Sequence, residues 1–242
     1  MSNAPRTFFD HSRHTLHINQ LDADLDVLAF HGEEHLSQPY LYRIEFTCSD
    51  LDLGAEKLIG QFADFKLYAD PSTLQVFSWE ALKPPTPLRT LYGRITSCKR
   101  LSGSVDEARY AVTLQPRLAL LARGQQTRIY LNQSVPDIVK SILMSRHDFV
   151  PGHFRFTLKR EYPRRDQVIQ YNESDLDFIS RLLADVGIWY RCTAHDEGAF
   201  DMVEFCDDQR CYEFDVTLPL RSPSGFSSHE DAVWALQTCH KV

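Results

Sequence analysis

Three histidines near the start of the chain have the spacing of a possible metal site. His11, His14 and His17 are three residues apart, so a helix would place their imidazoles on one face, where they could bind a metal ion. The neighbouring Thr15 and Ile18 favour an extended strand, in which this spacing sends successive side chains to opposite faces. We therefore favour an exposed N-terminal segment without a metal over a histidine site.

Three aspartates that follow are the second candidate for cation binding. Asp22, Asp24 and Asp26 alternate along the chain. A calcium loop also needs a glycine and a terminal glutamate at set positions, and the sequence has neither there. The alternation is typical of a strand edge whose carboxylates face water. We expect a solvent-facing row of charges here and no cation site.

The six cysteines have no spacing that indicates a metal site or a disulfide framework. They are Cys48, Cys98, Cys192, Cys206, Cys211 and Cys239, and no two form a Cys-x-x-Cys pair. Tetrahedral zinc sites usually take two close pairs of ligands, so Cys192, Cys206 and Cys211 are a weak zinc candidate. A chain of this length without a secretion signal favours reduced thiols.

Motifs of catalysis are missing from the sequence. It has no Gly-x-Ser-x-Gly nucleophile elbow, no Gly-x-Gly-x-x-Gly, no phosphate-binding loop and no His-Glu-x-x-His. Ser227 or Ser228 beside His229 does not indicate a hydrolase, because adjacent loop residues do not supply the geometry of nucleophile, base and orienting group. Catalytic groups can converge from distant positions, so a hydrolytic enzyme of the effector type stays an alternative. The residues favour no enzymatic activity and no cofactor.

Charge and hydropathy argue against two further classes of protein. The 242 residues carry a formal net charge of -7, whereas a nucleic-acid-binding protein needs clustered Lys and Arg. The densest basic run, from Arg160 to Arg165, contains Glu161 and Pro163 and is typical of a solvated turn. No stretch approaches the roughly 18 apolar residues that span a bilayer, and the N-terminus lacks a signal peptide. We expect a cytoplasmic protein with no membrane anchor and no nucleic-acid partner.

The first half of the chain has the period-two pattern of β-strands. Tyr42, Ile44 and Phe46 alternate with more polar residues across the strand predicted at 41–48. Further strands are predicted at 25–30, 65–68, 76–79, 88–98 and 110–114, with breaks at 70–72, 83–87 and 101–104. Several short strands at this spacing favour a barrel or a sandwich.

The periodicity then changes to that of helices. Ser134 is a good N-cap for a helix of about three turns that ends near His147. A second helix has Ser174 as its cap and Asp177 three residues later, a variant of the capping box. Gly187 supplies a left-handed stop at its end. The middle of the chain is therefore expected to be α+β.

The second helix is expected to bury one apolar stripe. The stripe consists of Leu176, Ile179, Leu183 and Val186, while Phe178 and Leu182 are expected in the core or between elements. Strands are predicted at 188–192, 200–205, 212–218 and 232–239. Trp189 is expected to pack in the core.

The stretch from Gln170 to Tyr190 resembles the signature of the VgrG family of bacterial type VI secretion. That signature has a Gln-Tyr-x-Glu-Ser-Asp start, a Phe-[Ile/Leu]-x-Arg-Leu-[Leu/Met] helix and a Gly-Ile-x-Tyr exit. The matching residues are Gln170, Tyr171, Glu173, Ser174, Asp175, Phe178, Arg181, Leu182, Gly187 and Tyr190. We expect structural roles for them, with no catalytic, metal-binding or cofactor-binding residue among them.

Other stretches are similar to the family in the same order. They lie at 32–40, 91–95 and 110–121, so that the resemblance covers about residues 15–210. The chain departs from the family at 128–134, where Arg-x-Phe-Gln is common, and at Asp185 and Val186, which replace two glutamates. Both departures fall at packing or surface positions and concern the subtype more than the family.

The resemblance implies a mainly β fold with an α+β insertion. In this arrangement a phage tail hub-like β-barrel domain is followed by a mixed α/β segment and the start of a second barrel. The expected domains are 1–124 for the first hub barrel, 125–208 for the insertion with the signature helix, and 209–242 for a truncated start of the second barrel. In full-length relatives an oligonucleotide-binding-like barrel and a β-helical needle follow the hub.

The resemblance also implies a function by assembly. A hub of the type VI spike forms a homotrimer at the tip of the tube and takes part in effector delivery. Its implied partners are its own copies, the hexameric tube protein, and effectors or adaptor proteins, and the type VI machinery would export it without a signal peptide. A phage tail or tailocin baseplate hub is the alternative of the same class. A small-molecule or glycan-binding barrel is disfavoured, because it would need an exposed aromatic cluster and Trp79, Trp189 and Trp234 are dispersed.

Overall fold

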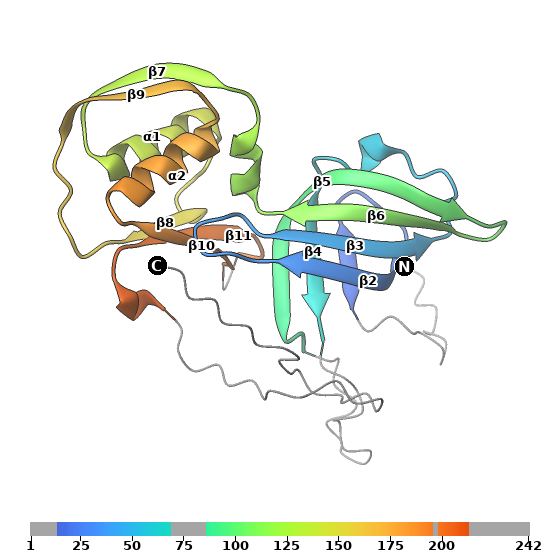
Figure 1. The fold of residues 1–242 in the computed structure, drawn as a ribbon. Helices are drawn as coiled ribbons and strands as arrows, with labels where there is room; N and C mark the ends of the chain where they lie inside the picture. The colour runs from blue at the N-terminus through green and yellow to red at the C-terminus, as the bar shows by residue number, and fades with distance from the viewer. Residues whose placement is uncertain (1–13, 69–85, 196–197, 213–242) are drawn as a thin grey trace, which may run out of the picture.

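The computed structural model describes residues 14–68, 86–195 and 198–212 (Figure 1). Several sequence predictions lie wholly or partly outside the described residues. They are His11, the strand at 76–79 with Trp79, most of the breaks at 70–72 and 83–87, the strands at 212–218 and 232–239, Ser227, Ser228, His229, Trp234 and Cys239, and all but the first residues of the expected second barrel.

Six antiparallel strands form the larger sheet of the described structure. They are β1 (Thr15–Ile18), β2 (Asp26–Glu33), β3 (Leu41–Cys48), β4 (Phe62–Leu67), β5 (Arg89–Gly103) and β6 (Ala108–Gln115). Their order in the sheet is β1-β4-β5-β6-β3-β2. The strand predicted at 41–48 matches β3, and the alternation there is confirmed, because Tyr42, Ile44 and Phe46 are all buried.

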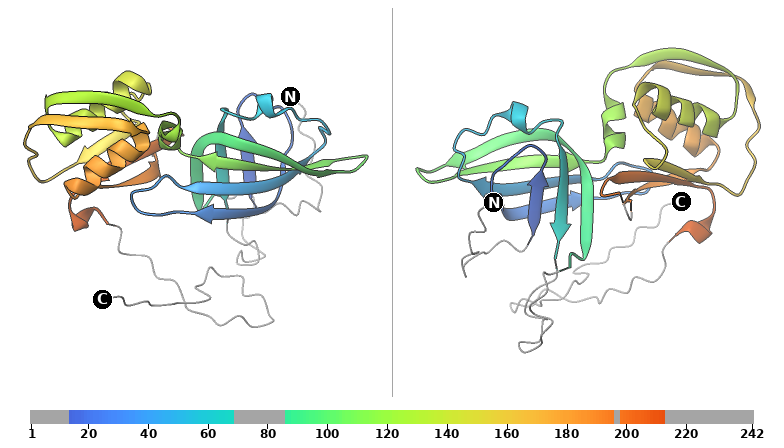
Figure 2. Two further views of the ribbon diagram at one scale, coloured as in Figure 1. Left: turned by 45° about the horizontal axis from the view of Figure 1, so that its top comes forward. Right: turned by 180° about the vertical axis from the view of Figure 1, so that it is seen from behind.

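This sheet curls into a half-open barrel around one hydrophobic core. Its first and last strands, β1 and β2, come close to each other, and Phe30 on β2 meets Phe65 on β4 with 5.2 Å between ring centroids. Ile44, Phe46 and Leu114 are fully buried inside. The curl is visible in Figure 2, where β5 bends around the end of the sheet. The barrel-like prediction is confirmed for this part of the chain.

The break predicted at 101–104 is in the wrong place. β5 continues through Gly103, and the turn to β6 lies at 104–107. Ser104 starts this turn, since its Oγ accepts hydrogen bonds from the backbone N–H groups of Asp106 and Glu107 at 3.3 and 3.1 Å. The polar residues before the turn resemble a loop in the sequence because they are exposed on the part of β5 that extends beyond the core.

The second part of the structure is a three-layer α+β unit. Its elements are β7 (Gln126–Gln133), α1 (Val135–Arg146), β8 (Phe154–Thr157), β9 (Arg165–Glu173), α2 (Asp175–Asp185), β10 (Trp189–Ala194) and β11 (Asp201–Cys206). β7 and β9 pair as a two-stranded ribbon, while β10, β11 and β8 form a sheet in that order. The two helices lie between the ribbon and the sheet (Figure 1). Short 3-10 turns at Ala55–Lys57, Arg117–Ala122 and Gln209–Cys211 complete the described elements.

Both predicted helices begin at the serine caps that the sequence indicates. The Ser134 hydroxyl accepts from the backbone N–H of Asp137, whose carboxylate in turn accepts from the backbone of Ser134. At α2, Ser174 accepts from the N–H of Asp177 at 3.1 Å. The end predicted near His147 is also confirmed, because His147 is the C-cap of α1.

The buried face of α2 differs from the predicted stripe. Phe178, Ile179, Leu182 and Leu183 are fully buried, whereas Leu176 and Val186 are only partly buried against the same core. The face is wider because α2 is covered by the ribbon on one side and the sheet on the other. A helix between two layers buries a wider arc than one amphipathic stripe.

Hydrogen bonds from the backbone and a shared side chain help to join the barrel to the α+β unit. Ser37 donates its N–H to the carbonyl of Tyr190 at 2.9 Å, and the N–H of Arg117 donates to Asp201 Oδ2 at 2.6 Å. Cys192 packs against both hydrophobic cores.

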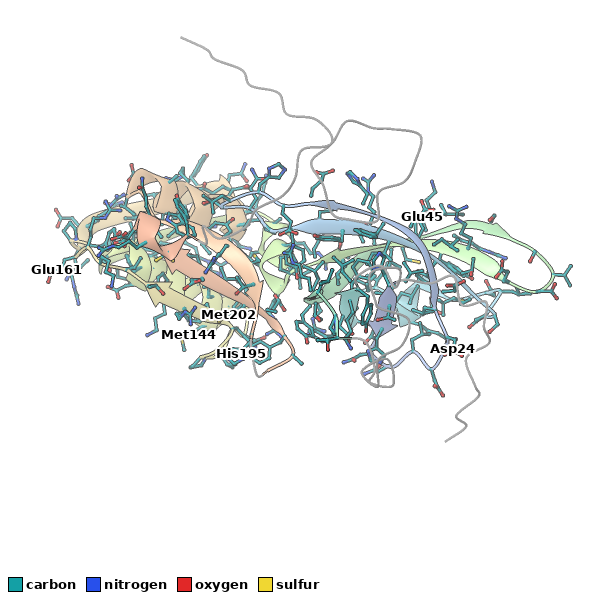
Figure 3. All side chains as sticks on the ribbon, turned by 90° about the horizontal axis from the view of Figure 1, so that it is seen from below. Asp24, Glu45, Met144, Glu161, His195 and Met202 are labelled. Carbon is teal, nitrogen blue, oxygen red and sulfur yellow. The ribbon has the colours of Figure 1, made fainter. Side chains whose placement is uncertain are left out.

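Figure 3 shows Asp24 and Glu45 on the barrel, and Met144, Glu161, His195 and Met202 on the other unit. No helix in the described part of the chain is long and apolar enough to cross a membrane.

Candidate functional site

The signature segment from 170 to 190 forms the centre of the α+β unit. Gln170 lies on β9, and Asp175 is the first residue of α2; both are buried. Gln170 Nε2 donates to Asp175 Oδ1 at 2.8 Å. Asp175 Oδ2 also lies 2.9 Å from Arg146 Nη2 and 2.7 Å from His147 Nε2, at the end of α1. One buried carboxylate therefore ties together β9 and both helices.

A second set of contacts fixes the start of α2 against β9. Arg181, one turn and a half into the helix, pairs with the carboxylate of Glu173 at 2.5 Å and donates to the carbonyl of Ile169 at 3.2 Å. Its guanidinium also lies over the ring of Phe178, 5.3 Å from the centroid. Hydrogen bonding to Glu173 raises the pKa of Arg181 above its ordinary value. The strand and the helix are thus held at a fixed angle.

Phe178 and Leu182 lie in the hydrophobic core of this unit. Phe178 is fully buried and stacks on Tyr130 of β7, with 5.4 Å between ring centroids. Leu182 is 1% exposed in the same cluster. These two signature residues connect α2 to the ribbon and to the rest of the core.

Gly187 ends α2 in a left-handed conformation. Its φ is 69°, and the N–H groups of Gly187 and Ile188 donate to the carbonyls of Ala184 and Leu183. This pair of hydrogen bonds is a Schellman motif, which requires positive φ at its glycine. Arg160 Nη2 then donates to the carbonyl of Gly187 at 3.0 Å, so the helix end is closed from outside as well.

The sequence predicts a solvated turn for the basic run from Arg160 to Arg165, but the structure also gives it specific contacts. Asp207 accepts hydrogen bonds from the N–H groups of Lys159 and Arg160 and from the hydroxyl of Tyr162, each at 2.9 Å. Burial raises the pKa of Asp207, but these hydrogen bonds outweigh it, and its pKa lies below the ordinary value. Arg165 pairs with Asp185 at 2.6 Å. The run is a connection that locks β8, β9 and the end of β11 together.

The two tyrosines of the signature have opposite environments. Tyr190 is 1% exposed, and its hydroxyl lies 3.4 Å from that of Ser180; burial raises its pKa to about 12. Tyr171 is 76% exposed. All other apolar or aromatic members of the signature are used inside the unit, so Tyr171 is available for an external contact.

Trp189 is not in the core, which corrects the sequence prediction. Ile188 and Tyr190 are buried on either side of it, while Trp189 is partly exposed and packs on Tyr212, with 4.8 Å between ring centroids. Alternation along β10 allows only every second side chain to face the helices. The indole faces away from them.

A charged cluster that was not predicted from the sequence lies on the outer face of the three-stranded sheet. Glu204 on β11 is buried and pairs with Arg155 at 2.8 Å and with Arg191 at 2.9 Å. Burial raises the pKa of Glu204, but hydrogen bonds from both arginines outweigh it, so its pKa lies below the ordinary value. A glutamate within an apolar strand run was the available signal, since a charge in such a place needs a partner.

The candidate metal ligands and carboxylates of the N-terminal region stay apart in the described structure. His14 lies against Phe30, whereas His17 on β1 reaches Asp64 at 3.2 Å. The three aspartates, Asp22, Asp24 and Asp26, are exposed, and only Asp26 belongs to β2. The described residues contain no group of three His, Cys, Asp or Glu side chains placed to hold a metal ion. The five cysteines in this part of the chain are free thiols.

The signature residues have structural roles. They cap, stop and anchor one helix, and they fix it to a strand and to a second helix. Such an arrangement gives a rigid unit with defined outer surfaces, which is what specific assembly requires.

Comparison with known proteins identifies similar chains. Residues 33–242 match the model of the family described as phage tail baseplate hub (GPD). The chain is 32% identical over 166 residues to the type VI secretion system spike protein VgrG1b of Pseudomonas aeruginosa, covering 69% of this chain and 20% of the relative. It is 34% identical over 205 residues to spike protein VgrG5 of the same organism, covering 82% and 23%.

A solved structure is similar over most of the chain. It is a component of the type VI secretion system of E. coli that is described as structurally similar to the T4 bacteriophage tail proteins gp27 and gp5. The TM-score is 0.74 at 46% identity, covering 86% of this chain and 53% of the other. The chain therefore spans about a fifth of the length of the curated relatives and about half of this solved chain.

Proposed function

Because the chain belongs to the phage tail baseplate hub family and is homologous to VgrG spike proteins, we propose that it is the hub part of a type VI secretion spike and acts by assembly. The observation that carries this proposal is the 46% identity, over 86% of the chain, to a solved type VI component with the same fold. The geometry supports it, since the signature residues serve to build a rigid unit.

The proposed assembly is a homotrimer that adapts the hexameric tube to the spike. In this proposal residues 1–124 form the first hub barrel, 125–208 the insertion, and 209–242 the start of a second barrel. The copies in the trimer are related by a closed rotation, so each copy presents two different surfaces to its neighbours. The tube protein and effectors or adaptor proteins are the proposed further partners, and the type VI machinery is the proposed route of export.

A non-catalytic role is part of the same proposal. The relatives that match are spike and hub proteins, and the family is that of a structural baseplate component. We propose no reaction for the described residues. Within the same class, a phage tail or tailocin hub is the second candidate, and the description of the matching family favours it. Neighbouring genes for a tube and a sheath without capsid genes would favour type VI secretion.

The test is the solution mass of the chain, measured by light scattering over a concentration series. The chain is measured alone and then with the purified tube protein of the same organism. A trimer, or a complex that forms only with the tube protein, is the expected result. A monomer that ignores the tube protein at every concentration would contradict hub assembly by this chain. An unrelated acidic protein of similar mass in place of the tube protein is the control.

A further inference from the structure

The outer face of the β7–β9 ribbon is an apolar surface without a partner in the described structure. Ile129 and Leu131 on β7 are 60% and 62% exposed, and Ile169 and Tyr171 on β9 are 48% and 76% exposed. Ile129 and Ile169 are directly paired across the ribbon. We call these four residues, Ile129, Leu131, Ile169 and Tyr171, the ribbon face.

This exposure follows from strand geometry. The alternate residues Tyr130, Val168 and Gln170 point to the other side, where they pack against α1 and α2. Figure 1 shows the ribbon arching over the helices on the side opposite to β8, β10 and β11. No described element covers its outer side. Clustered exposed apolar side chains of this kind mark interaction surfaces more often than single ones do.

The charges beside the ribbon face indicate the chemistry of the partner. Between residues 125 and 212, all arginines except Arg128 and Arg164 form ion pairs with carboxylates of the described chain. The paired ones are Arg146, Arg155, Arg160, Arg165, Arg181, Arg191 and Arg210. Arg128 and Arg164 are both exposed and lie at the ribbon. Arg164 donates to the carbonyl of Asn132, next to Leu131, and its charge reaches Asp137 without an ion pair.

A shallow cavity joins the basic and apolar parts. Its volume is about 350 Å³, and it lies between β7 and α1. The lining residues are Arg128, Ile129, Tyr130, Ser141, Ile142, Ser145 and Arg146. A partner side chain that enters here would meet a guanidinium and an aliphatic wall together. A carboxylate next to an apolar residue fits both.

We propose that the ribbon face, with Arg128 and Arg164 at its margin, is the docking site for an extended segment of another protein that has apolar side chains at its centre and carboxylates at its ends. The apolar residues cover the four ribbon-face side chains, and the carboxylates pair with the two arginines. In an extended segment alternate side chains point to one face, so its central apolar residues can lie on the ribbon face while carboxylates at its ends reach the arginines at the margin. The proposal uses contacts within one chain only and does not depend on the trimer.

The probe is a short fluorescent peptide with valine and serine alternating at its centre and glutamate at both ends, titrated against the whole chain by fluorescence anisotropy. Two control peptides replace either all glutamates by lysine or all valines by serine. We expect the valine-glutamate peptide to bind at least roughly tenfold tighter than either control. Binding should weaken as ionic strength rises, because the arginines are exposed.

Two double variants test the two halves of the site. The double variant Arg128→Glu, Arg164→Glu should bind the valine-glutamate peptide at least roughly tenfold more weakly and the valine-lysine peptide more tightly. The double variant Ile129→Ser, Ile169→Ser should weaken the binding of both peptides. The matched control is Lys99→Glu with Leu101→Ser on β5, an exposed basic and apolar pair on the barrel that should leave binding unchanged. Thermal melting of each variant reports whether it stays folded.

Several outcomes would overturn the proposal. One is binding of the valine-glutamate peptide weaker than about 1 mM. Another is equal binding of all three peptides, or equal loss in the control variant. A third is a concentration-dependent increase in mass that the ribbon-face variants abolish, since a second copy of the chain would then be the occupant. Failure of trimer or tube binding leaves the peptide result unaffected, so the two proposals can be told apart.

Discussion

At the scale of single residues, backbone conformation decides what position 187 can hold. Gly187 has a φ of 69°, and a Cβ built there would lie 3.3 Å from Arg160 Nη2. That nitrogen donates to the carbonyls of both Val186 and Gly187. A side chain at this position therefore has a strained backbone and also pushes on the arginine that closes the helix end.

We expect Gly187→Val to lower the free energy of unfolding by about 1–3 kcal/mol, because a β-branched residue resists positive φ. Gly187→Asn should cost clearly less, since asparagine tolerates the left-handed region. Urea denaturation followed by circular dichroism measures both. Equal stability of the valine variant and the parent would contradict the left-handed assignment.

A buried carboxylate should make stability depend on pH. Burial raises the pKa of Asp201 above the ordinary value of 3.8, although the N–H and the charge of Arg117 act against it. The proton is therefore bound more tightly in the folded state than in the unfolded state. Stability from this group is fully present below pH 3.8 and is lost as pH rises through the folded pKa.

Asp201→Asn removes the buried charge but keeps an oxygen that accepts from the Arg117 N–H. We expect this variant to melt no lower than the parent at pH 7 and to lose any advantage as the pH falls toward 4. Glu204→Gln is the contrasting variant, because the pKa of Glu204 is lowered and its stabilisation is present at neutral pH and lost in acid. Melting curves across the pH range distinguish them; parallel curves for the two variants would refute the assignment.

At the scale of elements, the layers on both sides of α2 decide which of its residues carry stability. The helix is covered by the ribbon and by the three-stranded sheet, so Phe178 is fully buried while Leu176 is only partly buried. The sequence predicted Phe178 in the core or between elements, but it also placed Leu176 on the buried stripe. Packing partners from distant parts of the chain, such as Tyr130 of β7, make the difference.

Phe178→Ala should cost about 3–5 kcal/mol, because it removes the stack on Tyr130 and leaves a cavity in the core. Leu176→Ala on the same helix should cost about 1 kcal/mol, since less of its surface is buried. Guanidinium denaturation of the two variants gives the comparison. A larger loss for Leu176→Ala would contradict the fuller burial of Phe178 on which this prediction depends.

At the scale of the whole molecule, two hydrophobic cores are joined through a small contact. The cores share Cys192, and the hydrogen bonds from Ser37 to Tyr190 and from Arg117 to Asp201 cross between them. Tyr190 and Asp201 are buried, and Ser37 and Arg117 are partly buried, so opening the junction would leave polar atoms of Tyr190 and Asp201 without these partners. We infer that the two units unfold together.

Ile44→Ala in the barrel and Ile179→Ala in α2 test this coupling, because both side chains are fully buried. Each change should cost about 2–5 kcal/mol and should lower one common transition in calorimetry. Tyrosine and tryptophan signals should report the same midpoint in each variant. Two separate transitions, with each variant shifting only one of them, would show independent units.

Local patterns in the sequence determined much of the fold. The alternation across 41–48, the serine caps at 134 and 174, and the stop at Gly187 act over a few neighbouring residues, and each is present in the structure. The sequence motif around Gln170 to Tyr190 likewise indicated the family. These features depend on backbone geometry and hydrogen bonds between residues close in the chain, so they can be read without the rest of the molecule.

Only the tertiary structure decided which surfaces are covered. It widened the buried face of α2 and placed Trp189 outside the core. It also paired Arg155, Arg160 and Arg165 with carboxylates far along the chain. It also left the ribbon face and Arg128 exposed. Burial and ion pairing are set by neighbours 20 to 50 residues away, as in the pairs formed by Arg165 and Arg155. The sequence alone does not show which of these distant residues come into contact, so it could not predict these ion pairs or the burial that accompanies them.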